Sequence, residues 1–297
     1  MLKNPLSHLV RGILLLVITL GSLIALPSVA GAVDIVCAPA TPSVAPAETP
    51  QGTPVPEQIP FPEEGGSMTV FAAASLVDGF TVIETNLESA NPGLDIVVET
   101  AGSQTLVTQL TEGAEADVLA TASTGSMANA IDAGVISGDA ANFIGNRLVI
   151  ITPFDNPADV TSFEDLANDD LLLVLAGAEV PAGQYARNAI CTGDDDFIAT
   201  VGNNIVSEEE NVRNVLAKVQ IGEADAGIVY ASDAVTATLA GAEINVIEFP
   251  HSINTTAVYP IAPVTGGNAA LADAFISYIL TADGQQTLLD YGFTSAG

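Results

Sequence analysis

Four positions at which an expected strand gives way to an expected helix carry residues that could hold an anion. Ser75 and Ser103 each follow a strand-like run and begin a helical one, and residues 181–182 and 211–212 occupy two further starts of this kind. The first turn of a helix leaves backbone N–H groups unpaired and carries the positive end of the helix dipole, so it can bind an anion without Lys or Arg. Ser and Asn also cap helices without any ligand. The anion hypothesis therefore requires that all four starts converge.

The elements that must position these residues alternate along the chain. Hydrophobic periodicity predicts helices from Ser75, from about Thr105, and within 181–191, 211–222 and 269–291, where two helices are expected. Short apolar runs predict strands at 68–73, 94–100, 116–122, 146–152, 171–176, 226–230, 244–249 and 257–263. This alternation predicts an α/β fold with mostly parallel sheets, in which ligands bind beyond the carboxyl ends of the strands.

Composition excludes several classes of protein. At 297 residues the chain is long enough for two domains. It has 6 Lys and Arg against 36 Asp and Glu, a net charge of −30, which argues against binding to nucleic acid or to an anionic membrane surface. Two His and two Cys leave no basis for a His/Cys metal cluster or a disulfide framework. A Cys37–Cys191 bond would tie a spacer to a helix, so we do not expect it.

The N-terminal residues resemble an export signal. Lys3 and Arg11 precede and border the apolar run 12–26, and small residues at 30–32 offer a cleavage site, which predicts a signal peptide over 1–32. An uncleaved anchor helix and a lipid on Cys37 remain alternatives. Residues 33–66 are rich in Pro, Ala and Thr and are expected to form a disordered spacer.

Other residues with chemical potential favour simpler interpretations. His251 and Ser75 could belong to a hydrolytic triad, but no G-x-S-x-G motif accompanies them. Residues 194–196 are acidic without EF-hand spacing, so a solvated loop is expected rather than a calcium site. Arg147 and Arg213 are expected to pair with local carboxylates.

Several segments together resemble the molybdate-binding proteins of molybdate ABC importers. The segments are TVFAAASLVDGF (69–80), GSQTLVTQLTEGAEADVLATAS (102–123), NRLVIITP (146–153), VPAGQYAR (180–187), ENVRNVLAKVQIGEADAGIVYASDAV (210–235) and YPIAPV (259–264). They cover essentially all of 67–297 in the order found in the family. The resemblance implies a periplasmic-binding-protein type II fold, with two α/β lobes and a ligand cleft between them.

The expected lobes are 67–150 plus 255–297, and 151–254. The family's function implies a monomeric extracytoplasmic protein that captures molybdate or tungstate and delivers it to a membrane ABC permease. It implies no enzymatic activity, no cofactor, and no direct bond between the protein and a metal. Binding of another oxyanion such as sulfate is the alternative, and an extracellular hydrolase is the remote one.

Carried over by motif, the residues expected to bind the anion are Ser75, Ser103, Ala182, Val212 and Tyr230. Hydroxyl and backbone N–H groups would donate every hydrogen bond. Hydrogen phosphate would then find no acceptor for its proton, whereas smaller sulfate could be rejected only by size, and tungstate hardly at all. The sequence departs from the family pattern at Gln104, and residues 208–210, all Glu, precede the Val212 helix start.

Overall fold

The computed structural model describes residues 33–37 and 58–296. The predicted signal peptide (1–32) and residues 38–57 of the predicted spacer lie outside these ranges. Within the described residues, no helix is both long and apolar enough to cross a membrane.

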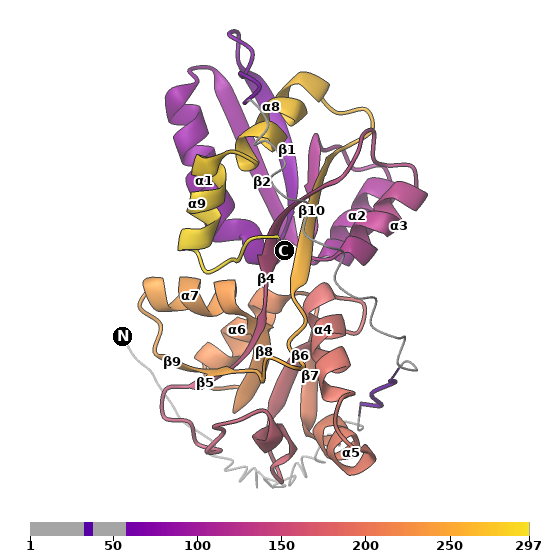
Figure 1. Cartoon of the computed structure of the whole chain (residues 1–297), viewed down its shortest axis with the longest axis vertical. Helices are drawn as coiled ribbons and strands as arrows, with labels where there is room; N and C mark the ends of the chain where they lie inside the picture. Colours follow the sequence, from indigo (N-terminus) through magenta and orange to yellow (C-terminus); the bar gives the residue numbers. More distant parts are fainter. Residues whose placement is uncertain (1–32, 38–57, 297) are drawn as a thin grey trace, which may run out of the picture. The chain divides into compact units, whose positions relative to one another are not determined.

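The first lobe is built on a five-stranded sheet of order β2-β1-β3-β10-β4 (Figure 1). Helices α2 and α3 pack on one face of this sheet, and α1, α8 and α9 cover the other. The strands are β1 (Gly66–Ala73), β2 (Leu94–Ala101), β3 (Val118–Ala120), β4 (Ala141–Asn146) and β10 (Ala257–Pro263). The helices are α1 (Val77–Ala90), α2 (Ser103–Thr111), α3 (Thr124–Asp132), α8 (Ala269–Ile279) and α9 (Ala282–Asp290), with a 3₁₀ turn η1 (Ala74–Leu76) before α1.

The second lobe repeats this plan with a sheet of order β7-β6-β8-β5-β9. Its strands are β5 (Leu148–Pro153), β6 (Leu173–Ala176), β7 (Ile205–Glu209), β8 (Ala226–Tyr230) and β9 (Ile244–Glu248). Its helices are α4 (Pro181–Ile190), α5 (Asp195–Asn204), α6 (Val212–Gln220) and α7 (Ala231–Leu239), with a 3₁₀ turn η2 (Glu164–Ala167). The chain enters this sheet at Arg147 and leaves it between β9 and β10, so the predicted boundary at 150 falls inside β5.

In each sheet four of the five strands run in the same direction, so the expectation of mostly parallel sheets is confirmed, but one strand runs antiparallel to the others. In each sheet the strand that follows a passage between lobes is inserted antiparallel between two others: β10 between β3 and β4, and β5 between β8 and β9. These strands arrive from the opposite lobe and therefore run against the strands already present. Their neighbours β1, β2 and β3, and likewise β6, β7 and β8, pair in parallel.

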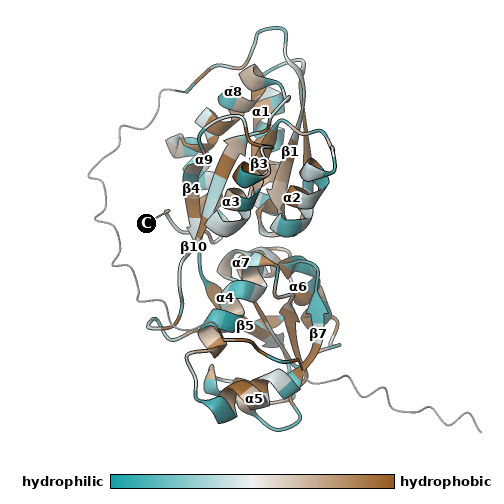
Figure 2. Cartoon of the chain, turned by 90° about the vertical axis from the view of Figure 1, so that its right-hand side faces the viewer, coloured by the Kyte–Doolittle hydropathy of each residue, from teal (hydrophilic) through white to brown (hydrophobic). Residues whose placement is uncertain are grey.

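Buried apolar strands form the core of both lobes, as expected for sheets covered on both faces. In Figure 2 the hydrophobic strand residues lie between helices whose outer faces are hydrophilic. Phe80, Phe143 and Phe275 pack against one another under α1 and α8, and Tyr259 joins them edge-on through Phe143. The fully buried Tyr259 therefore stands at the point where the core of the first lobe meets the passage between lobes.

Several elements were missing from the sequence-based prediction: α3, β4, β7, α7 and α5. The acidic segment 194–196, expected to be a solvated loop, begins α5. Asp194 caps this helix by accepting a hydrogen bond from the backbone N–H of Phe197, and Asp195 and Asp196 stand in its first turn, where the dipole favours negative charge.

Both ends of the predicted spacer lie against the folded protein. Cys37 forms a disulfide with Cys191 at the end of α4, contrary to our expectation. Val33 and Ile35 pack on the core beside α5, which brings Cys37 to α4. Sulfur in a disulfide cannot carry a lipid, so this structure contradicts lipidation at Cys37.

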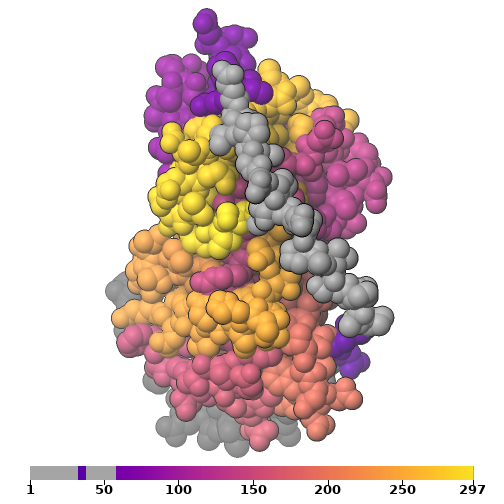
Figure 3. Space-filling model, in the orientation of Figure 1, coloured from indigo at the N-terminus to yellow at the C-terminus, as the bar shows by residue number. Residues whose placement is uncertain are grey.

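At the other end, the backbone N–H of Ile59 donates to Ser277 Oγ at 2.9 Å, and Phe61 is buried. The two segments, 33–37 and 58–66, therefore rest on different lobes, and both are visible in indigo on the surface in Figure 3. The disordered spacer predicted over 33–66 was too long at both ends.

Reduction of this disulfide should lower the stability of the protein. The bond joins residues 154 positions apart, so breaking it frees a long loop in the unfolded chain. We expect the free energy of unfolding to fall by about 2–4 kcal/mol, measured by urea denaturation with and without a reductant. The Cys37→Ser/Cys191→Ser double variant should show the reduced value in both conditions. Two titratable thiols in the untreated, unfolded protein would contradict the disulfide.

Candidate functional site

A small cavity lies where the two lobes meet, at the carboxyl ends of several strands. Its volume is about 10 Å³, which is about the volume of one water-sized sphere. A space of this size has room for about one oxygen atom and excludes a larger organic molecule, so a whole tetrahedral anion requires the lobes to lie slightly further apart. All five predicted residues line it: Ser75 and Ser103 from the first lobe, and Ala182, Val212 and Tyr230 from the second.

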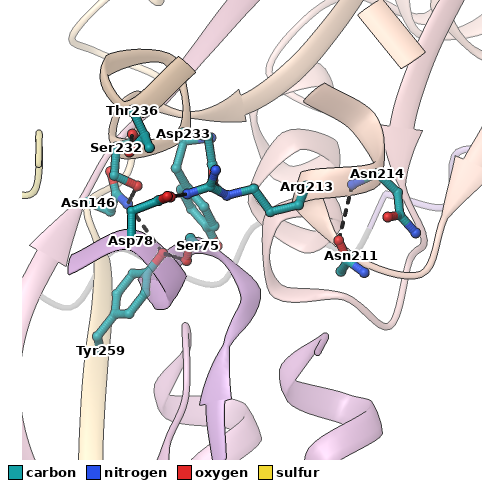
Figure 4. Close-up of polar contacts among 11 residues, drawn as sticks. Ser75, Asp78, Asn146, Asn211, Arg213, Asn214, Ser232, Asp233, Thr236 and Tyr259 are labelled. Atoms are coloured by element: carbon teal, nitrogen blue, oxygen red, sulfur yellow. Dashed lines mark hydrogen bonds and ion pairs between the residues drawn. The ribbon is translucent and has the colours of Figure 1, made fainter. Parts of the chain in front are cut away.

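The four helix starts converge on this cavity, as the anion hypothesis required. The η1 turn and α2 begin directly after β1 and β2, and α4 and α6 begin at the same cavity from the other side. Asn211 caps α6 by accepting a hydrogen bond from the N–H of Asn214, at 3.1 Å (Figure 4). This cap leaves the N–H of Val212 without an intrahelical partner. Pro181 has no N–H, so Ala182 provides the first donor of α4.

The side-chain hydroxyls at the cavity are buried and available as donors. Ser103 Oγ accepts a hydrogen bond from the Ala122 backbone N–H at 3.0 Å, which leaves its own proton to donate elsewhere. Tyr230 Oη has no hydrogen-bond partner among the described residues. Burial raises the pKa of Tyr230 well above its usual value, so the phenol stays protonated and can donate.

Every Lys and Arg side chain in the described part of the chain is paired with a carboxylate, and none of them lines the cavity. The predictions for Arg147 and Arg213 are confirmed. The pairs are Arg147–Glu248, Arg187–Glu208, Arg213–Asp78, Arg213–Asp233 and Lys218–Glu209. Glu208 and Glu209 are thus paired with cations of their own lobe, which weakens the repulsion that they would exert on an anion at the Val212 helix start.

Two polar contacts near the cavity join the lobes. Arg213, next to Val212, contacts Asp78 of α1 and also lies with its Nε 2.7 Å from Oδ1 of the fully buried Asp233 (Figure 4). Gln104 Nε2 donates to the carbonyl oxygen of Glu210 at 2.9 Å. Gln104, which departs from the family pattern, therefore serves as a contact between lobes. The sequence carried no signal that identified these partners.

The geometry gives no support to a hydrolase. Ser75 Oγ lies 2.9 Å from Tyr259 Oη rather than beside a base, and His251 is exposed. A nucleophilic Ser requires a hydrogen-bonded base to take its proton, and the described residues provide none at Ser75.

Comparison with known proteins agrees with this geometry. Residues 68–294 match the family model described as bacterial extracellular solute-binding protein. The chain belongs to this family. A relative in Mycobacterium tuberculosis, named molybdate-binding protein ModA, is 38% identical over 234 residues, which cover 78% of this chain and 86% of the relative. The resemblance stated from the sequence motifs is thereby confirmed. These relatives are binding proteins and not enzymes.

Solved structures show that this solute-binding protein shares its fold with proteins for different anions. The periplasmic molybdate-binding protein of Azotobacter vinelandii matches with a TM-score of 0.67 at 17% identity, over 76% of this chain and 98% of that one. The sulfate-binding protein SubI of Mycobacterium tuberculosis matches with a TM-score of 0.69 at 17% identity, over 77% and 86%. The two-lobe α/β fold is confirmed, and fold alone does not choose the ligand.

Gly102 allows the lobes to approach each other. A Cβ at this position would lie 2.5 Å from the Glu210 carbonyl oxygen and 2.4 Å from Gln104 Nε2. Gly102→Ala should therefore hold the lobes apart and weaken molybdate binding about tenfold or more, since a bound anion must contact both lobes. Isothermal calorimetry measures the effect.

The matched control is Gly125→Ala, where a Cβ would meet nothing closer than Ser123 Oγ at 3.9 Å. Thermal stability should stay near the wild-type value in both variants, because opening of the lobes relieves the clash at Gly102. Equal affinity in wild type and Gly102→Ala would show that the lobes do not need this approach.

The buried carboxyl of Asp233 should make stability depend on pH. Burial raises its pKa from about 3.9 in the unfolded chain to about 6 in the folded protein, even though Arg213 opposes the shift. The folded state thus binds this proton more tightly, and stability is lost as the pH rises from 4 to 6. Relative to Asp233→Asn, the wild type should lose about 2 kcal/mol over this range.

Urea denaturation of both proteins at a series of pH values measures this difference. The sign is the critical result: a wild type that gains stability over Asp233→Asn as the pH rises would mean that the ion pair with Arg213 outweighs burial.

Proposed function

We propose that this protein is an extracytoplasmic solute-binding protein that captures molybdate or tungstate and delivers it to a membrane ABC permease. The observation that carries the proposal is the convergence of uncharged donors from both lobes on one small cavity. The similarity to a protein named molybdate-binding protein ModA selects molybdate among the anions that such a cavity could hold.

In this proposal the five predicted residues bind the oxyanion. Ser75 and Ser103 donate through hydroxyl and backbone N–H groups, Ala182 and Val212 through backbone N–H groups, and Tyr230 through its phenol. Among the described residues, none of those that line the cavity carries a carboxylate or other anionic side chain. An anion that carries no proton can therefore satisfy every donor, and its charge strengthens each hydrogen bond.

Selection between sulfate and molybdate then depends on size, because both are tetrahedral dianions. The donors belong to two different lobes, so their separation changes as the lobes move. A larger oxyanion meets all of them with the lobes slightly further apart than a smaller one requires. Only a closed arrangement makes all the bonds, and we propose that the permease recognises this closed, liganded form.

The Cys37–Cys191 disulfide supports a location outside the cytoplasm. Disulfides persist in oxidising compartments and are rare in the cytosol of most organisms. Together with the signal peptide expected over 1–32, this favours export of the protein. The bond also secures the segment that follows the signal to the second lobe.

Calorimetry against molybdate, tungstate, sulfate and phosphate tests the function. We expect micromolar or tighter binding of molybdate and tungstate and weak binding of sulfate and phosphate. Ser103→Ala should lose about 1–3 kcal/mol of molybdate binding, the loss expected for a missing donor to a charged group. Ser137→Ala, which removes an exposed hydroxyl far from the cavity lining, is the control. Tighter binding of sulfate or phosphate than of molybdate would reject the proposal.

A further inference from the structure

A chain of hydrogen bonds runs from the passage between lobes to Ser75. Arg147 donates its backbone N–H to Asn146 Oδ1 at 3.0 Å, and Asn146 Nδ2 lies 3.3 Å from Tyr259 Oη. Tyr259 Oη lies 2.9 Å from Ser75 Oγ, which lines the cavity (Figure 4). Asn146 and Tyr259 themselves are fully buried and do not line it. They can therefore affect the anion only through Ser75.

The backbone N–H of Arg147, the first group in this series of hydrogen bonds, determines which atom donates in each of the later ones. Because a backbone N–H can only donate, the atom of Asn146 that faces Arg147 must be the carbonyl oxygen. The amide nitrogen, which can only donate, then faces Tyr259 and Ser232, with Ser232 Oγ at 2.8 Å. Tyr259 Oη therefore accepts a hydrogen bond from Asn146.

Tyr259 must then use its O–H group to donate a hydrogen bond to Ser75. Tyr259 Oη makes hydrogen bonds with two groups among the described residues, and Asn146, the first of them, is a donor. Burial raises the pKa of Tyr259, so the phenol keeps its proton. Ser75 Oγ accepts this hydrogen bond, and the O–H group of Ser75 remains available to donate into the cavity.

Ser103 likewise accepts a hydrogen bond from the protein and can donate one into the cavity, but a different kind of group fixes this polarity. Ser103 Oγ accepts a hydrogen bond from the backbone N–H of Ala122. Only a substitution of Ala122 by Pro could remove this donor. At Ser75 the corresponding donor is a side chain, which in turn is oriented by another side chain. The polarity of Ser75 can therefore be changed by mutation, and its role can be measured.

We propose that Tyr259, oriented by Asn146, is a positioning residue that makes Ser75 a donor and thereby excludes oxyanions that carry a proton. If Ser75 instead accepted a hydrogen bond from hydrogen phosphate, its own O–H group would either have to turn toward Tyr259 or be left without an acceptor among the described residues. The phenol O–H of Tyr259 would then lose Ser75 as its acceptor, and Asn146, which offers only N–H groups on that side, cannot replace it. The inference rests on the proposed function, since it concerns selection among oxyanions in that cavity.

Asn146→Asp should reverse the chain. A carboxylate at this position accepts from Tyr259, Tyr259 accepts from Ser75, and Ser75 then presents a lone pair to the cavity. Binding of molybdate and of inorganic phosphate is measured by calorimetry at about pH 8, where both are dianions. The added charge weakens both alike and cancels in the ratio of their dissociation constants. We expect the preference for molybdate over phosphate to shrink about tenfold or more.

Tyr259→Phe provides a second test that introduces no buried charge. It removes the donor to Ser75 and should reduce the preference for molybdate about three- to tenfold. Asn142→Asp, on the same strand and exposed, adds the same charge as Asn146→Asp and should leave the ratio unchanged. Tyr291→Phe is the matched control for Tyr259→Phe, because Tyr291 does not line the cavity.

The outcomes separate this inference from the proposed function. If the wild type binds molybdate and the ratio stays constant in Asn146→Asp and Tyr259→Phe, the relay does not set selectivity and the inference is overturned. An equal loss for both anions has the same meaning, because it shows only a structural role. If the wild type does not bind molybdate, the proposed function fails and the inference falls with it. Should Asn146→Asp not fold, Tyr259→Phe decides the result.

Discussion

A dianion in a protein of net charge −30 requires short, well-aimed hydrogen bonds, and this requirement governs the arrangement of both lobes. Long-range fields are screened within about 10 Å at 0.1 M salt, whereas a charge-assisted hydrogen bond in a buried site keeps its strength. Backbone N–H groups can be aimed only by the element that carries them. The carboxyl ends of β1 and β2 and the starts of α4 and α6 must therefore face one another, and the order of the two sheets accomplishes this.

The few cations of the protein serve this arrangement indirectly. Arg213 stands beside Val212 in the sequence, yet its guanidinium turns away to Asp78 and Asp233 and joins the two lobes. The cavity thus keeps neutral walls, and the charge that could have bound an anion nonspecifically holds the lobes together instead. Gln104 and Gly102 contribute a hydrogen bond to the Glu210 carbonyl oxygen and a close approach of the lobes. The side chains of Arg213 and Gln104, which join the lobes, are thus distinct from the donors that line the cavity.

Local signals in the sequence predicted most of the strands and the helix starts at the cavity, whereas the five residues expected to bind the anion came from the resemblance to molybdate-binding proteins. Apolar runs of β type mark β8 and β10, and Pro181 and Asn211 mark helix starts. The features that depend on contacts between distant parts of the chain were not predicted. These are the antiparallel insertion of β5 and β10, the Cys37–Cys191 bond, and the contacts of Arg213. The helix at α5 was missed for another reason, since its acidic first turn resembles a solvated loop until the cap at Asp194 is seen.

Asn146 makes contacts both within the first lobe and between the two lobes. It ends β4, immediately before the chain passes to the second lobe at Arg147, and its amide donates to Tyr259 of the first lobe and to Ser232 of the second. The N–H of Arg147, at the passage itself, orients that amide. A movement of the lobes about this passage must change the Asn146–Ser232 contact, and the same amide sets the polarity of Ser75. The hydrogen-bonding character of the cavity and the closure of the lobes are thus linked through one side chain.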